Sequence, residues 1–206
     1  MIDVACLADR PSHVLPSDSC RQIMAPTLSE PAWHLLQAMP RFAARLETLL
    51  GTILGPADIH TLMPEDREII EAGAAFWQRS AAAAGGLLYQ GAIRLIVSGA
   101  DVTKLVSICG ADARLAALTF VRPDGIGIPA KAGGEGVELL IAAIRTASLA
   151  AYADWLWSLP EGFARRVAAL WPIEKSDIGA LTVTDGASVF RSAAHQLLRQ
   201  FDAKGQ

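Results

Sequence analysis

The amino-acid sequence predicts a mainly α-helical fold, arranged as an irregular helical bundle. Apolar residues recur at intervals of three and four through most of the chain, and proline or glycine interrupts these runs where helices should end. No repeat at a solenoid period is visible. The 206 residues are 52% hydrophobic and 19% charged, so the chain can form a core without disulfides or metal. We expect a single helical domain over residues 27–206.

The first half of this domain is predicted to contain several short helices. Residues 1–26 mix prolines with polar residues and sustain no helical period, so they are expected to form a flexible N-terminal leader. Two helices follow, separated by Pro40 and ending near Gly55. Another begins at Pro64, where proline and acids suit a first turn, and should stop at a pair of glycines, residues 85–86. Further helices are expected over residues 87–96, from an N-cap at Ala100-Asp101 to Cys109, and over 112–118.

The second half is predicted to contain the longest helix. Glycine and proline punctuate residues 123–136, which favours a loop there, with a short β-hairpin near 120–130. The long helix spans about 137–159, and its apolar residues form one buried stripe that includes Trp155. A shorter helix follows Pro160. A brief extended segment is expected near 180–184, before a C-terminal helix capped by Asp185.

Charge and cysteine content exclude several classes of protein. The net charge is −3 and neither half of the chain is basic, which argues against nucleic-acid binding. The apolar stretch at 80–93 is too short to span a membrane, and that at 139–153 carries Arg145, so no direct membrane insertion is expected. The three cysteines are an odd number, which favours a reducing compartment.

No residue pattern predicts catalysis, a cofactor or a metal. The spacing of Cys6, His13 and Cys20 matches no common chelating loop. The glycines at 125–127 lack the strand and helix that surround a dinucleotide-binding turn, and the acids after Pro64 suit a helix start. The alternative that stays open is a small helical enzyme or ligand-binding protein with a pocket between the helices at 87–96 and 137–159.

Three residues are candidates for a partner contact. Trp157 lies two positions after Trp155, so it must point away from the buried stripe. An aromatic residue that leaves a core face either contacts a partner or folds against another helix, here the C-terminal one. Arg165 and Arg166 follow closely and could border such a contact.

Several segments together resemble a known family. The sequence GLLYQGAIR at residues 86–94, with LV at 105–106 and the helix at 112–118, resembles the central signature of the SctK family of type III secretion systems, which includes the YscK, PscK and NolU proteins. PAWHL at 31–35 and MP at 39–40 are similar to its N-terminal part. The long helix and its successor are similar to its C-terminal part, so the resemblance covers about residues 27–172.

This resemblance implies a non-enzymatic adaptor in the cytosolic sorting platform of the secretion apparatus. The protein would link the cytoplasmic domain of the inner-membrane ring protein (SctD-like) to the C-ring pod protein (SctQ-like), and secretion would require it. It would lie in the cytoplasm, peripheral to the inner membrane. Affinity in such complexes is concentrated in a few aromatic or arginine residues, and we expect Trp157, Arg165 and Arg166 to take this role.

Overall fold

The computed structural model describes residues 1–124, 136–173 and 185–204, and their regular elements are helices. The predicted mainly α-helical, irregular bundle is therefore confirmed. The chain divides into two compact units, which we call unit 1 (Met1–Ala72 and Leu159–Pro172) and unit 2 (Gly73–Ser158 and Ile173–Gln206). This division differs from the predicted single domain over 27–206. Its boundaries fall at Gly73, whose φ of 87° interrupts the helical backbone, and just before Pro160.

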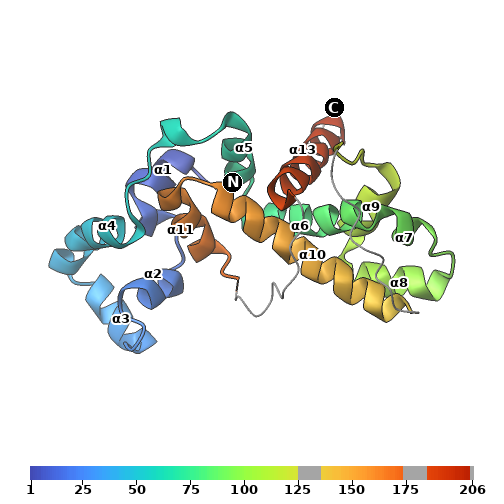
Figure 1. Cartoon of the computed structure of the whole chain (residues 1–206). Helices are drawn as coiled ribbons and strands as arrows, with labels where there is room; N and C mark the ends of the chain where they lie inside the picture. The colour runs from blue at the N-terminus through green and yellow to red at the C-terminus, as the bar shows by residue number, and fades with distance from the viewer. Residues whose placement is uncertain (125–135, 174–184, 205–206) are drawn as a thin grey trace. The chain divides into compact units, whose positions relative to one another are not determined.

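Unit 1 combines the N-terminal helices with one helix from late in the sequence. Its elements are α1 (Val4–Asp9), η1 (Pro11–His13), α2 (Ser17–Met24), α3 (Glu30–Gln37), α4 (Pro40–Leu54), η2 (Ile59–Thr61), α5 (Pro64–Ala72) and α11 (Glu161–Leu170) (Figure 1). The helices predicted on either side of Pro40 and after Pro160 are confirmed. α11 contacts α1, α2 and α4, so the two ends of this unit's sequence share one core.

The predicted flexible leader is wrong, because residues 1–26 form α1, η1 and α2. Asp3 caps α1 by accepting hydrogen bonds from the amides of Ala5 (3.0 Å) and Cys6 (3.1 Å). Val4 and Leu7 are buried, and α1 contacts α5 and α11. These helices are so short that their few apolar residues give no periodic signal, and contacts with distant elements stabilise them.

Unit 2 is organised around α6 (Ala74–Leu88). This helix packs against α9 (Ala111–Thr119), α10 (Val137–Ser158) and α13 (Gly186–Lys204), which surround it in Figure 1. The shorter helices are α7 (Gln90–Arg94) and α8 (Gly99–Cys109). Trp155 of α10 stacks on Phe190 of α13 with 4.7 Å between ring centroids, and Trp77 of α6 lies 6.3 Å from Trp155. These rings form the centre of the core.

The glycine pair at 85–86 does not end a helix as predicted. The predicted helix from Pro64 is instead divided at Gly73 into α5 and α6, and α6 continues through the pair to Leu88. Gly85 meets α10, where a Cβ would lie 2.8 Å from the carbonyl oxygen of Ile144. Gly86 meets α9 in the same way. The two glycines allow α6 to approach its neighbouring helices closely. Because α6 continues to Leu88, the helix predicted over 87–96 is shorter in the structure and corresponds to α7.

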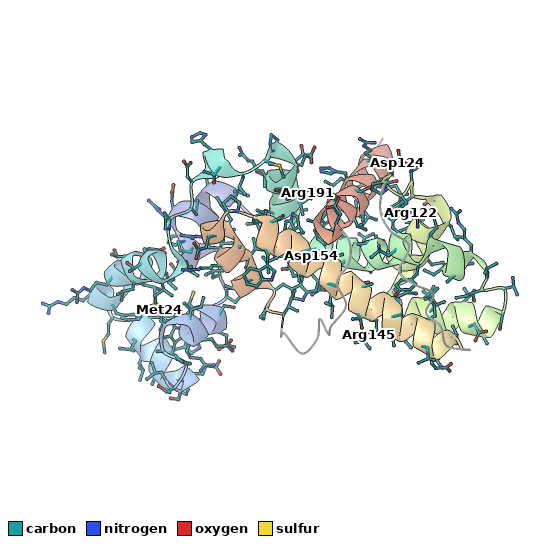
Figure 2. All side chains as sticks on the ribbon, viewed as in Figure 1. Met24, Arg122, Asp124, Arg145, Asp154 and Arg191 are labelled. Carbon is teal, nitrogen blue, oxygen red and sulfur yellow. The ribbon has the colours of Figure 1, made fainter. Side chains whose placement is uncertain are left out.

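The long helix and the C-terminal helix are confirmed as α10 and α13. Of the predicted β-hairpin, residues 120–124 form no strand, and the remainder lies outside the described residues, as does the extended segment at 180–184. Among the helices described, α10 is long and apolar enough to cross a membrane, with a mean hydropathy of 1.3. Half of that stretch is buried in unit 2, as in the core helices of soluble proteins, and Arg145 is exposed on it (Figure 2).

Candidate functional site

Trp157 is the most exposed aromatic residue among the described positions of α10. Its exposed fraction is 68%, whereas Trp155, two residues earlier, is fully buried. This contrast confirms that Trp157 points away from the buried stripe. At this exposure the ring contributes little to the core of unit 2, so it remains a candidate contact.

Polar residues lie on either side of Trp157 along α10. Asp154 lies one turn earlier on α10, and its side chain lies against Gly186 at the start of α13. Partial burial, followed by the charge of Asp185, raises the pKa of Asp154. Ser158 accepts a hydrogen bond from Arg191 at 2.7 Å.

Arg166 is a structural residue, which corrects its nomination as a partner contact. Its side chain is 2% exposed. The guanidinium donates to four carbonyl oxygens at distances of 2.8–3.3 Å: those of Leu7 and Ala8 in α1, of Gly55 just after α4, and of Gly162 one turn earlier in α11. Burial lowers the pKa of Arg166, and the charge of Asp9 opposes this shift. The spacing from buried Phe163 is the sequence signal that could have placed Arg166 on the inner face of α11.

Arg165 lies on the exposed side of α11. Its Nη1 donates to the carbonyl oxygen of Ile53 at 3.1 Å, and its Nη2 pairs with the carboxylate of Glu161 one turn earlier. Arg165 belongs to unit 1 and Trp157 to unit 2, so we treat them as two separate candidate contacts.

Arg165 also lines an open groove in unit 1, which sequence reasoning missed. The groove has a volume of about 290 Å³. Its lining comes from α2, the end of α4 and the last turns of α11, and comprises Ser19, Gln22, Ile23, Leu54, Arg165, Ala168, Ala169 and Pro172. No local motif announces it, because the three helices are brought together only by the fold.

The segment at 86–94, which carries the family resemblance, makes packing contacts and hydrogen bonds within unit 2. Gln90 donates to the carbonyl oxygen of Phe120 (3.1 Å), and Arg94 Nε donates to that of Ala117 (2.8 Å), so both satisfy acceptors at the end of α9. Tyr89 is buried, which raises its pKa. These residues fix the packing of α7 against α9.

Chemistry at other predicted positions is limited. Within the described parts of the chain, no three His, Cys, Asp or Glu residues come together as a metal site. The thiols of Cys20 and Cys109 are buried against carbonyl oxygens of Leu15 (3.9 Å) and Ile141 (3.7 Å). Where α6 crosses α10, Gly85 is in direct contact with Ile144.

No family model matches the chain, and neither a curated protein nor a solved structure is significantly similar to it. The resemblance to the SctK family therefore depends on the residue pattern across positions 27–172 alone. The geometry offers two surface features for a function: the exposed ring of Trp157 and the groove beside Arg165.

Proposed function

We propose that the protein is a non-enzymatic adaptor of a type III secretion system. In this proposal it belongs to the cytosolic sorting platform and links the inner-membrane ring protein (SctD-like) to the C-ring pod protein (SctQ-like). It acts in the cytoplasm at the face of the inner membrane and needs no cofactor. The pattern of hydrophobic and glycine positions at 27–172 supports this assignment, as does the helical fold.

The observation that carries the adaptor role is the exposure of Trp157. Tryptophan is among the most buried residues on average, and a ring 68% exposed gives up apolar burial that folding would otherwise gain. Tryptophan and arginine are also the residues most enriched among those that dominate binding energy at protein interfaces. Trp157 therefore has the properties of a contact that a partner completes.

The division into two units supports the same role. Unit 2 carries Trp157 and unit 1 carries the groove beside Arg165, so each unit has a surface feature suited to a protein contact. A linking protein needs two such surfaces, one for each partner. Arg166, buried in the core of unit 1, takes no part in either.

The test is co-purification of the tagged chain from its own cells in mild detergent, with mass spectrometry of the proteins recovered. We expect the ring and pod proteins. Trp157→Ala should raise the Kd for one of them about 30-fold, the effect of losing an interface residue worth about 2 kcal/mol, and its recovery should fall accordingly.

Leu95→Ala is the matched control, because Leu95 is 80% exposed in the same unit and should leave recovery unchanged. Both variants should keep the melting temperature of the wild-type chain. A chain that brings down neither the ring nor the pod protein would exclude the adaptor function.

A further inference from the structure

We infer that the groove of unit 1 binds a partner segment in which an aliphatic side chain stands beside a carboxylate. This inference rests on the proposed adaptor function and names the chemistry of one of its contacts. It concerns the surface formed by α2, the end of α4 and α11, to which no other role has been assigned above.

The floor of the groove is apolar and is hollow because of two alanines. Ala168 and Ala169, both half-buried, occupy positions of α11 where longer side chains would fill the space. Leu54 and Ile23 provide aliphatic surface from α4 and α2. A volume of about 290 Å³ is at the lower limit for a pocket that encloses a small-molecule ligand, and the site is open. It suits an aliphatic side chain of a protein segment lying across the surface.

The positive charge of Arg165 in the groove favours a carboxylate next to the aliphatic side chain of the bound segment. Among the described residues that line it, only Arg165 is ionised at neutral pH, and no carboxylate lies in the lining. The ionised groups of α2, Asp18 and Arg21, stand outside the lining and pair with each other at 3.2 Å. The partner of Arg165, Glu161, also stands outside the lining. A segment with a carboxylate beside its aliphatic anchor therefore matches the groove in charge.

Arg165 can accept this partner at little cost. Its present partner, Glu161, is 78% exposed and Arg165 itself 47%, and ion pairs between such exposed groups on one helix contribute little to stability. The planar guanidinium has more donors than its bonds to Ile53 and Glu161 use, and its geometry fits a carboxylate with two parallel hydrogen bonds. An incoming carboxylate can share or replace Glu161. Gln22 is exposed at the groove and offers a further donor.

The experiment selects short random peptides displayed on phage against the full-length chain. We expect enrichment of sequences with Leu, Ile or Val next to Asp or Glu. Synthetic fluorescein-labelled copies of the enriched peptides, and counterparts in which the acids are replaced by their amides, are then titrated by fluorescence anisotropy.

Three variants separate the two parts of the site. Arg165→Glu should weaken the acidic peptides about tenfold or more and leave the amide counterparts nearly unchanged. Glu161→Gln removes the competing carboxylate and should tighten the acidic peptides about threefold. Ala169→Trp fills the hollow and should abolish binding of both kinds of peptide. Arg45→Glu, an exposed change on α4 outside the groove, is the control.

The inference is overturned if no peptide is enriched, if the enriched peptides lack acids, or if Arg165→Glu and Arg45→Glu have equal effects. Because Arg165 and Glu161 are exposed, these two variants should fold even if Ala169→Trp does not. The peptide assay needs no secretion component. Loss of the groove proposal therefore leaves the co-purification result standing, and a failed co-purification leaves the peptide result standing.

Discussion

Gly86 of α6 lies against the main chain of Ala113 on α9, so closely that a Cβ on Gly86 would come within 2.7 Å of the Ala113 carbonyl carbon. The backbones of two helices meet here without an intervening side chain. Backbone atoms cannot move aside as the end of a flexible side chain can, so any larger residue must separate the helices.

Gly86→Ala is therefore expected to destabilise the protein by about 3 kcal/mol, even though alanine has the higher helix propensity. Gly91 in α7 is the matched control, because nothing lies within 4 Å of its hypothetical Cβ. Gly91→Ala should be neutral or slightly stabilising in urea unfolding followed by circular dichroism. Equal effects of the two substitutions would contradict the close crossing of α6 and α9.

Arg166 joins α11 to α1 by hydrogen bonds, and replacing it should destabilise the packing of α1. Arg166→Met leaves several buried carbonyl oxygens without a donor, which should cost about 3 kcal/mol. Arg166→Lys keeps the charge but loses the planar set of donors, so its effect should be intermediate.

The control for this prediction is Arg165→Met, which should change stability by no more than about 0.5 kcal/mol because Arg165 is exposed. Hydrogen exchange gives an independent measurement, since the amides of α1 should exchange faster in Arg166→Met. Equal stability of the two methionine variants would show that Arg166 does not hold α1.

The sequence alone predicts the helices that proline delimits, because proline acts locally: α3 and α4 meet at Pro40, and α11 begins after Pro160. It does not predict the role of Gly86, since glycine both ends helices and allows them to touch. Whether a glycine ends a helix or allows close contact depends on the residue that faces it, here Ala113. The tertiary fold determines which residue that is.

The difference between local and tertiary determinants also explains which candidate residues the sequence predicts correctly. Helical spacing correctly places Trp157 outside the buried stripe, because Trp155 fixes the orientation of α10. Arg165 and Arg166 look equivalent in the sequence, and a charged residue on a buried face runs against the ordinary pattern. The groove depends on three segments that are distant along the chain, so no local pattern contains it.

Arg79 and Asp112 join α6 to α9 by two hydrogen bonds, of 2.8 and 2.9 Å, and the Arg79 guanidinium lies 4.6 Å from the centroid of the Phe201 ring. The bond to Asp112 raises the pKa of Arg79. A double-mutant cycle with Arg79→Met and Asp112→Asn should give a coupling energy of about 1 kcal/mol that decreases with added salt. A coupling near zero at low salt would mean that the two groups act independently.

Cys20 should make stability depend on alkaline pH. Burial, with the charge of Glu47, raises the pKa of Cys20 from 9.0 to about 11. The folded state therefore holds the thiol proton more tightly, so this contribution is complete below pH 9.0 and is lost as the pH rises toward about 11. The wild-type chain should lose about 2 kcal/mol more of its unfolding free energy than Cys20→Ala does across this interval. Cys6→Ala, which removes a partly exposed thiol, serves as the control and should follow the wild-type curve.

The same burial should protect Cys20 from alkylation. Because the thiolate is the reactive form, iodoacetamide at about pH 8 should modify Cys6 in the native chain and reach Cys20 and Cys109 only after unfolding in urea. Peptide mass spectrometry after timed quenching measures each site separately. Rapid native modification of Cys20 would show that α2 does not stay packed on α4, and would remove one wall of the groove that contains Arg165.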